Sequence, residues 1–194
     1  MGKIVISTNA TLDGVIQDPD GAERFARGGW FSPAGSNDRE AWATIETAEA
    51  MRTEALLLGR RSYEWFATRW ASRGGDWADR LNGLPKYVVS SRLSEAAATW
   101  GPTTLLRGDL STEVSKMKRE RDGDIVIYAS YRLGQALLEH DLVDELRLFV
   151  YPVVLGTGNR LFGETSGKKP LRLVDAATIG DSLALLTYET VRDA

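Results

Sequence analysis

The sequence contains no cysteine and a single histidine, His140, among its 194 residues. Without cysteine sulfur there are no disulfide scaffolds, thiolate nucleophiles, cysteine zinc sites or cysteine-ligated iron–sulfur clusters. One imidazole excludes a histidine cluster, and the carboxylates show no calcium-loop pattern, so we expect no dedicated metal site. His140 lies near the end of a predicted helix, where the helix dipole favours a cation. Capping or surface exposure therefore explains it better than catalysis.

The sequence also lacks an excess of one charge and any long hydrophobic run. Its 24 Lys and Arg residues stand against 27 Asp and Glu residues, giving a formal net charge of -3. This balance provides no basic surface for nucleic acid or for an anionic membrane. The apolar run at residues 4–6 is too short for a signal peptide, and no segment approaches the roughly 18 apolar residues of a membrane span. We expect a cytoplasmic protein with no nucleic-acid and no membrane partner.

Two glycine-rich nucleotide-binding motifs are missing as well. Neither G-x-G-x-x-G after a strand nor G-x-x-x-x-G-K-[ST] occurs, so a nucleotide would be bound by a different arrangement. The composition, with 43% hydrophobic and 26% charged residues, is that of a globular protein. The length favours one domain that spans residues 1–194.

Predicted strands and helices alternate over the first two thirds of the chain. Short apolar or β-branched runs predict strands at residues 3–8, 55–58, 87–89, 104–106 and 125–128. Helical patterns occupy the intervals between them, at residues 36–55, 60–66 and 111–121, and another begins just after residue 130. A long strand at residues 145–155, broken at Pro152, precedes an antiparallel pair at residues 171–174 and 183–191. We predict an α/β fold of three layers, a mostly parallel sheet with helices on both faces and an antiparallel C-terminal edge.

Residues 67–85 interrupt this alternation. The segment carries Gly74-Gly75, Asn82-Gly83 and Pro85 among several charges, which predicts an irregular surface connection. We expect either a lid over a ligand or a long loop.

Ligands of such sheets bind outside the carboxyl ends of the strands, which selects the loops at residues 59–62, 90–92 and 129–132. In the first loop, Gly59, Arg60, Arg61 and Ser62 begin a helix. Its unpaired N–H groups, two guanidinium groups and hydroxyl suit a phosphate group. A glycine turn followed by solvated arginines explains these residues equally well.

The other two loops carry weaker signals. Ser90, Ser91 and Arg92 offer hydroxyl donors beside a cation, as a phosphate monoester requires, although an ordinary polar loop is the more common meaning. Ala129 and Ser130 follow the strongest strand and open a helix. The hydroxyl of Ser130 could contact a diphosphate or cap the helix.

Aromatic and acidic residues supply candidates for the substrate side. Trp30 and Trp70 lie in predicted loops and could stack on a planar ring, with hydrophobic cover as the alternative. Asp13 follows the first strand and could hydrogen-bond a substrate or form a turn.

Four segments form a pattern that extends in order along nearly the whole chain. They are Thr11-Leu12-Asp13-Gly14, Leu58-Gly59-Arg60-Arg61-Ser62-Tyr63-Glu64, Lys86-Tyr87-Val88-Val89-Ser90, and the block from Leu142 to Phe162. The pattern resembles the dihydrofolate-reductase-like family that includes the C-terminal reductase domain of bifunctional riboflavin-biosynthesis proteins. The block from Leu142 to Phe162 is the most specific part of the resemblance.

The resemblance implies a dihydrofolate-reductase-like three-layer sandwich and an NADPH-dependent reductase of a pterin-like or pyrimidine ring. Arg60 and the segment Ser90–Arg92 would contact the adenosine 2′-phosphate, and Arg61 and Ser62 the diphosphate. Ala129 and Ser130 match a segment that is usually Gly-Ser, where glycine lets the backbone approach the cofactor. The added methyl of Ala129 therefore bears on cofactor affinity.

The implied riboflavin-type activity is reduction of 5-amino-6-(5-phosphoribosylamino)uracil, because the chain lacks the zinc-binding His and Cys residues of the partner deaminase domain. The sequence departs from those reductases in lacking their Trp-Ile-Thr-like segment and the Asp-Pro that follows their glycine turn. It looks like a stand-alone branch of the family. Two further functions stay open: a pterin or dihydrofolate-type reductase, and a non-catalytic NADP(H)-binding protein. A structural dimer module without a nucleotide site is a third, and the family resemblance itself implies a homodimer formed through the C-terminal strands.

Hydride transfer needs a fixed nicotinamide and a source of a proton. In dihydrofolate reductases a carboxylate on the first helix serves the substrate ring. Here Asp38 and Glu46 lie on the predicted first helix, and Asp13 ends the strand before it. We prefer Asp13 as the catalytic residue because it belongs to a matching motif.

Overall fold

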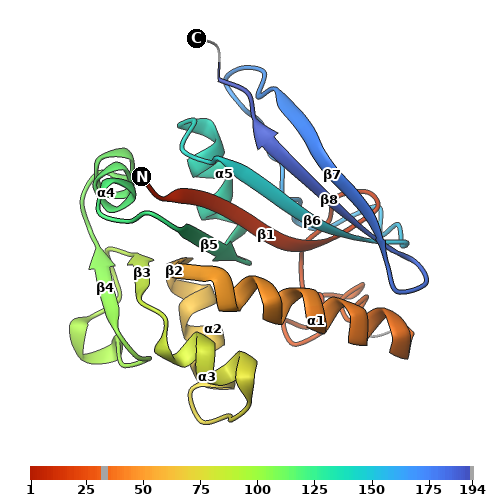
Figure 1. Cartoon of the computed structure of the whole chain (residues 1–194), viewed down its shortest axis with the longest axis horizontal. Helices are drawn as coiled ribbons and strands as arrows, with labels where there is room; N and C mark the ends of the chain where they lie inside the picture. Colours follow the sequence, from red (N-terminus) through yellow and green to blue (C-terminus); the bar gives the residue numbers. More distant parts are fainter. Residues whose placement is uncertain (32–34, 193–194) are drawn as a thin grey trace.

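Short apolar segments build the sheet at the centre of the molecule. The computed structural model describes residues 1–31 and 35–192, in which eight strands form one sheet (Figure 1). Across the sheet these are β4 (Thr103–Leu106), β3 (Lys86–Val89), β2 (Thr53–Gly59), β5 (Asp124–Tyr128), β1 (Lys3–Thr11), β6 (Glu145–Tyr151), β8 (Leu183–Thr190) and β7 (Leu171–Ile179). The strands from β4 to β6 are all parallel, so their carboxyl ends meet at one edge.

The C-terminal strands reverse direction as predicted. β8 is antiparallel to β6, and β7 is antiparallel to β8. β7 runs further than the predicted residues 171–174, because its hairpin pairing with β8 continues to the pair Ile179 and Leu183. The predicted mostly parallel sheet with an antiparallel edge is confirmed.

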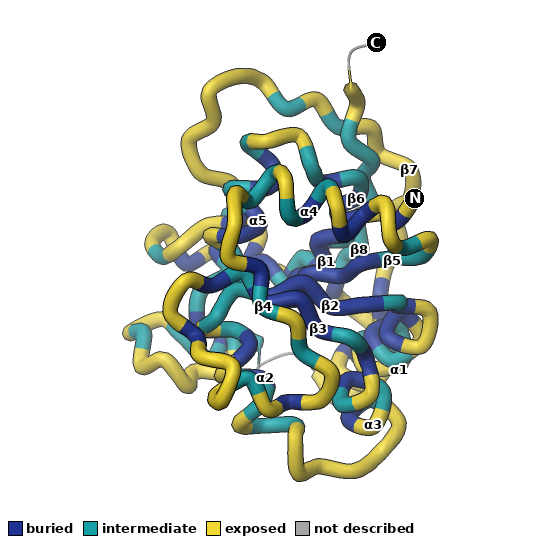
Figure 2. The backbone as a smooth tube through the Cα atoms, turned by 90° about the vertical axis from the view of Figure 1, so that its left-hand side faces the viewer, coloured by how far each residue is buried: buried dark blue, intermediate teal, exposed yellow. Residues whose placement is uncertain are grey.

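Helices cover both faces of the sheet. α4 (Leu110–Arg119) and α5 (Tyr131–Glu139) lie on one face, and α1 (Ser36–Arg52), α2 (Arg60–Trp70) and α3 (Asp76–Gly83) lie on the other (Figure 1). The central strands are therefore buried on both sides, as their continuous apolar runs predict, and Figure 2 shows them as the dark interior of the molecule. In the part of the chain that the structure describes, no helix is long and apolar enough to cross a membrane.

Residues 67–85 are not the irregular connection that we predicted. They contain the end of α2 and the whole of α3, in which Leu81 is fully buried. Asn82 fixes the segment, since its Nδ2 donates to the carbonyl of Trp70 at 3.0 Å and its Oδ1 accepts from Trp100 Nε1 at 2.6 Å. Because α3 leads into the start of β3, it lies by the edge opposite the strand carboxyl ends. This placement speaks against the lid, one of the two alternatives that the sequence left open.

Two cations on this side of the sheet bind backbone carbonyls. Arg80 of α3 donates to the carbonyls of Ala50 and Thr53 at 3.0 and 2.5 Å, which satisfies acceptors at the end of α1. Lys86 is 1% exposed and donates to the carbonyl of Leu84 at 2.7 Å, and its Nζ lies 4.4 Å from the centre of the Trp100 ring. Burial lowers the pKa of Lys86 to about 8.

Candidate functional site

The carboxyl ends of β2, β3 and β4 enclose an open cationic cleft of about 440 Å³. Among its lining residues are Arg60, Ser90, Ser91, Arg92 and Arg107. The structure thus brings together residues from two of the three loops that we selected from the sequence. Sequence reasoning missed Arg107, although this residue directly follows β4 and the strand-end rule would have selected it.

The three arginines of this cleft differ in their partners. Arg60 donates to both carboxylate oxygens of Glu64, one turn along α2, at 2.9 Å. Arg107 lies 3.6 Å from the carboxylate of Glu95, with both side chains largely exposed. Arg92 is exposed and forms no ion pair with any described residue. Exposed ion pairs are weak, so they leave the guanidinium groups of the cleft open to an anion such as a phosphate.

Serine hydroxyls shape the two loops beside the cleft. Ser90 Oγ accepts the N–H of Arg92 at 3.1 Å, so Ser90 holds the loop after β3, while Ser91 is exposed. Ser130, in the turn between β5 and α5, makes two hydrogen bonds to the turn between β2 and α2. Its Oγ accepts the N–H of Gly59 at 3.1 Å, and its N–H donates to Ser62 Oγ at 3.0 Å. These two bonds join the β2–α2 turn to the β5–α5 turn. Ser130 therefore connects two loops and does not cap α5 with its side chain.

Ala129 and Ser130 both have left-handed backbone, with φ of 52° and 56°. A side chain in this conformation costs roughly 1–2 kcal/mol, which glycine avoids. Ala129 is exposed, so its methyl lies on the surface where the two turns meet. Arg61, at the adjacent helix start, is exposed and lies 3.4 Å from the carboxylate of Glu23 in the loop before α1.

Asp13 lies in the loop after β1, where its carboxylate organises the backbone. It accepts the hydroxyl of Thr11 at 2.6 Å and the N–H groups of Leu155 and Gly156 at 3.1 and 2.8 Å. These bonds, that of Thr11 foremost, hold the pKa of Asp13 far below its usual range. The bonds favour the loop-shaping alternative over the catalytic role that we preferred from the sequence.

The two carboxylates of α1 that we considered also separate. Asp38, in the first turn, accepts the hydroxyl and N–H of Ser182, and this lowers the pKa of Asp38. Asp38 therefore anchors α1 to the β7–β8 hairpin. Glu46 is 5% exposed and has no hydrogen-bond partner among the described residues. Burial and the charge of Glu49 raise the pKa of Glu46 well above its ordinary value.

Polar side chains surround Glu46 in the layer between α1 and the sheet. On the sheet, Ser7 of β1 pairs in register with Tyr128 of β5, and Trp42 of α1 donates to Asn9 Oδ1 at 2.9 Å. In the described part of the chain, two of the hydroxyls here have no hydrogen-bond partner: Ser7 and Tyr151. The hydroxyl of Tyr128 lies beside Glu49 and Thr53. Burial, together with the nearby glutamates, raises the pKa values of both tyrosines. Sequence reasoning missed these residues, since each reads as a core position of a strand.

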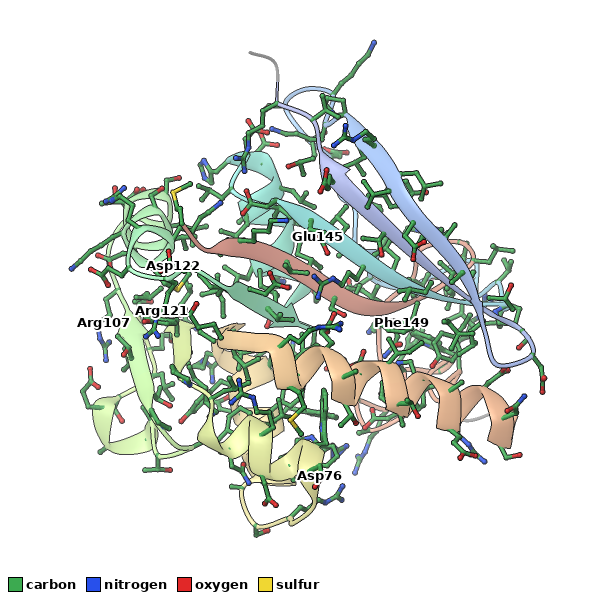
Figure 3. All side chains as sticks on the ribbon, in the orientation of Figure 1. Asp76, Arg107, Arg121, Asp122, Glu145 and Phe149 are labelled. Carbon is green, nitrogen blue, oxygen red and sulfur yellow. The ribbon has the colours of Figure 1, made fainter. Side chains whose placement is uncertain are left out.

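The two tryptophans that we proposed for substrate stacking lie apart. Trp30 is 6% exposed, donates to the carbonyl of Gln17 at 2.8 Å and packs edge-on against Tyr151 at 5.4 Å. It therefore borders the polar cluster as cover. Trp70, at the end of α2, packs against Trp77. In Figure 3, Arg107 of the cationic cleft is labelled at the left and Phe149 of β6, the strand next to Trp30, at the right.

Known proteins share this architecture. The putative riboflavin biosynthesis protein of Shewanella sp. PV-4 superimposes with a TM-score of 0.75 at 20% identity, over 98% of this chain and 99% of that one. Dihydrofolate reductase of Enterococcus faecalis, solved with NADP(H), gives a TM-score of 0.61 at 13% identity over 97% and 96%. The uncharacterized protein YwjB of Bacillus subtilis (strain 168) is 32% identical over 94% of this chain and 95% of its own. The model of the RibD C-terminal domain matches residues 2–185, and the chain therefore belongs to that family.

Proposed function

We propose that the protein is an NADPH-dependent reductase of a small heterocycle. The observation that carries this proposal is the cleft in which Arg60, Arg92 and Arg107 gather with Ser90 and Ser91 at the strand carboxyl ends. Membership of a reductase domain family and the fold shared with an NADP(H)-bound reductase support it.

The residues present fit a dinucleotide with an extra phosphate. The arginine and serine side chains of the cleft would hold the adenosine 2′-phosphate. The start of α2, at Gly59, Arg61 and Ser62, would hold the diphosphate through N–H groups and a guanidinium. The link between Ser62 and Ser130 keeps the two turns in one arrangement before the ligand arrives.

NADPH would supply the hydride to an electron-poor carbon of the ring. The side chains beneath α1 would bind and orient that ring, because their unpartnered hydroxyls need hydrogen-bond partners. Burial and the charge of Glu49 raise the pKa of Glu46, so Glu46 holds its proton to higher pH than an ordinary glutamate, and in its protonated form it can donate a hydrogen bond to a ring nitrogen or oxygen. We assign Glu46, and no longer Asp13, as the carboxyl group of the substrate end.

Two heterocycles are candidates for the substrate. The family-level candidate is 5-amino-6-(5-phosphoribosylamino)uracil, which a Thermotoga maritima relative of this fold is named for reducing. The alternative is a pterin or dihydrofolate-type ring, consistent with the shared dihydrofolate reductase fold.

A thermal-shift titration with NADPH, NADH and NADP+ tests the proposal, because a ligand of the native state raises stability by RT ln(1 + [L]/Kd). We expect a shift with NADPH that exceeds the shift with NADH and that Arg92→Ala removes. Arg119→Ala, which removes an exposed arginine of α4, is the matched control. Equal shifts with NADPH and NADH would contradict the assignment of the 2′-phosphate site.

Binding without turnover is a second candidate function, and Ala129 is the observation that favours it. Its methyl lies on the surface where the two turns meet, in place of the glycine usual in the family. A protein of this kind would bind NADPH but oxidise none of it with any heterocycle.

We also propose that two copies associate through the C-terminal strands. β7 is the last strand of the sheet, and its Leu173 and Val174 side chains are 51% and 45% exposed. Such an edge is usually covered in soluble proteins. Light scattering after size exclusion tests this, and Leu173→Lys should yield monomers if β7 is the contact.

A further inference from the structure

α2 begins with two arginines, although the N-terminus of a helix disfavours cations. Arg60 and Arg61 directly follow Gly59, and no acidic residue lies in the first turn of the helix. The backbone N–H groups give a helix N-terminus a partial positive charge, so two guanidinium groups at this position work against the helix. Residues that oppose the local structure are expected at functional sites. The start of α2 therefore serves the binding of an anion better than it serves the helix.

Arg60 forms an ion pair with Glu64, and this pair contributes little to the helix. Nη1 of Arg60 donates to both carboxylate oxygens of Glu64 at 2.9 Å, one turn further along α2. A pair of this spacing stabilises a helix best when the acidic residue comes first, whereas here the arginine comes first. The two side chains are also 38% and 45% exposed, so water weakens the pair. Helix stability therefore gives little reason for a carboxylate at position 64.

The contact of Arg60 with Glu64 leaves one edge of the guanidinium group free. Nε and Nη2 of Arg60 have no hydrogen-bond partner among the described residues. This edge carries the parallel N–H groups that bind two phosphate oxygens at once. Arg60 lines the cationic cleft, whereas Glu64 is not one of its lining residues. Glu64 thus holds the corner of the guanidinium group at Nη1 and leaves the opposite edge to a ligand of the cleft.

The three arginines of the cleft differ in how they are held before a ligand binds. Nη2 of Arg107 donates to the backbone carbonyl of Leu93 at 2.7 Å. Arg92 is exposed and forms no ion pair with any described residue. Ordering a long side chain costs free energy on binding, so an arginine that is already fixed binds an anion more tightly than a mobile one. Arg60 owes its fixed position to Glu64.

We propose that Glu64 is a positioning residue of the cofactor site, which holds Arg60 in the orientation that receives the adenosine 2′-phosphate. Glu64 thereby strengthens the preference for NADPH over NADH without contacting either cofactor. The inference rests on the proposed function and names a residue that sets the selectivity of that site. The negative charge of Glu64 is partly exposed and paired with Arg60, so water and the guanidinium group screen it from the phosphate.

A double-mutant cycle with NADPH and NADH as ligands tests this. Glu64→Met keeps the length and helix preference of the side chain but removes its acceptor oxygens. We expect this variant to bind NADPH about threefold more weakly and to bind NADH as the parent does. In an Arg60→Ala background the same substitution should leave NADPH affinity unaltered, because the residue that it acts through is gone.

Two further variants separate positioning from charge. Glu64→Gln keeps an acceptor oxygen for Arg60 but loses the charge, so it should recover most of the lost NADPH affinity. Glu40→Met makes the matched change on the exposed face of α1 and should bind both cofactors as the parent does.

Four results overturn the inference. A loss of NADPH affinity that persists in the Arg60→Ala background means that Glu64 supports the fold of the site in general. Tighter NADPH binding by both Glu64→Met and Glu64→Gln means that repulsion outweighs positioning. An equal loss for NADH, or no loss at all, means that Glu64 does not act on the 2′-phosphate. Failure of the parent protein to bind either cofactor overturns the proposed function itself, so the two failures are distinguishable.

Discussion

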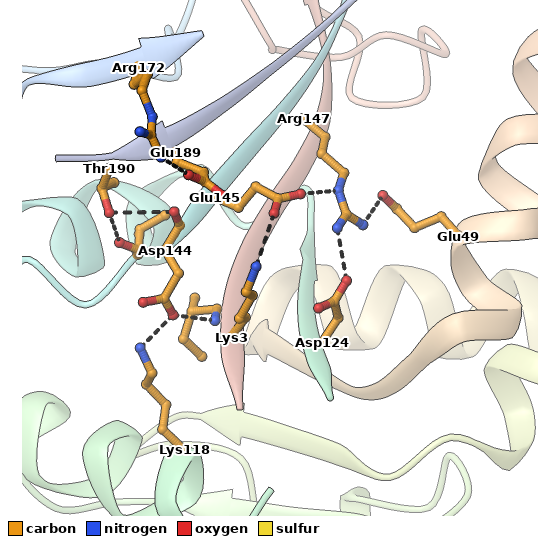
Figure 4. A network of polar contacts seen from close by, with 12 residues as sticks. Lys3, Glu49, Lys118, Asp124, Asp144, Glu145, Arg147, Arg172, Glu189 and Thr190 are labelled. Carbon is orange, nitrogen blue, oxygen red and sulfur yellow. Dashed lines mark hydrogen bonds and ion pairs between the residues drawn. The ribbon is translucent and has the colours of Figure 1, made fainter. Parts of the chain in front are cut away.

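Two regions of the sheet differ in charge and in exposure. At the ends of β2 to β4, arginines line an open cleft and their ion pairs are exposed. Beneath α1, carboxylates and hydroxyls are buried, and the arginine among them is bound by three carboxylates. One parallel sheet thus carries exposed arginines at the carboxyl ends of β2 to β4 and a buried, net acidic cluster around Arg147 near the starts of β5 and β6 (Figure 4). The difference teaches that the side chains at each edge, and not the sheet itself, set the local charge.

Removal of two arginines should have the largest effect on this comparison. We expect the double variant Arg92→Ala and Arg107→Ala to weaken NADPH binding about 100-fold, because each charged hydrogen bond contributes about 1.5–3 kcal/mol. NADH, which lacks the 2′-phosphate, should bind both forms alike. Fluorescence titration of the bound nicotinamide measures the two affinities. A similar loss for NADH would show that the arginines contact a different part of the cofactor.

Between α1 and the sheet, Tyr151→Phe should lower turnover without lowering the stability of the fold. The Tyr151 hydroxyl has no partner among the described residues, so we expect the free energy of unfolding to stay level or rise by up to about 1 kcal/mol. Turnover should fall about tenfold, as for one lost hydrogen bond to the substrate. Tyr63→Phe is the matched control, because the Tyr63 hydroxyl accepts the N–H of Trp100 at 2.8 Å. We expect this control to unfold more readily in urea, by about 1 kcal/mol.

Glu46 should make stability depend on pH. Its pKa is raised in the folded protein, so the unfolded chain releases this proton first as the pH rises above about 4.5. The contribution of Glu46 to stability therefore falls with rising pH, up to the raised pKa. Glu46→Gln removes that fall, and at pH 8 we expect its Tm to exceed that of the parent by about 3 °C. Glu40→Gln should show no such gain, and parallel Tm profiles of parent and Glu46→Gln between pH 5 and 8 would contradict the assignment.

The smallest expected effect belongs to Ala129, where the two βα turns meet. In Ala129→Gly, release of roughly 1 kcal/mol of backbone strain offsets the entropic cost of glycine of about 0.5–1 kcal/mol, so stability should change little. We expect NADPH affinity to rise about twofold to threefold, because backbone without a methyl can approach the diphosphate. Ala43→Gly, in the exposed middle of α1, should only destabilise the protein, by about 1 kcal/mol. Unaltered NADPH affinity in Ala129→Gly would mean that the methyl does not border the cofactor.

Sequence patterns predicted the sheet and much of the cationic end. Apolar runs that end in glycine or serine identify parallel strands and the loops that follow them. Arg60 and residues 90–92 could therefore be predicted as site residues from the sequence. The strand at residues 104–106 was predicted too, and Arg107 directly follows it, so the same strand-end rule selects Arg107.

The polar residues between α1 and the sheet could not be predicted from the sequence, for a physical reason. Tyr128 and Tyr151 close apolar strands and have the pattern of core residues, and only the register of β5, β1 and β6 shows that they face α1. Asp13 follows β1 and Glu46 lies in the middle of α1, and only hydrogen bonds and burial, which a sequence does not show, separate their roles. The helix α3 was missed because glycine and asparagine pairs indicate loops, whereas packing of Leu81 against the core outweighs that local preference.

Lys86 carries a consequence for the chemical environment in which the protein is most stable. Its ammonium group is buried against backbone carbonyls and the Trp100 ring, and its pKa is lowered to about 8 from an ordinary 10.5. Between these two values the folded protein has released a proton that the unfolded chain still holds, so the contribution of Lys86 to stability rises with pH. Mild alkali therefore raises the contribution of Lys86 to the free energy of unfolding, whereas a methionine at this position would leave the carbonyls of Asn82 and Leu84 without their donor.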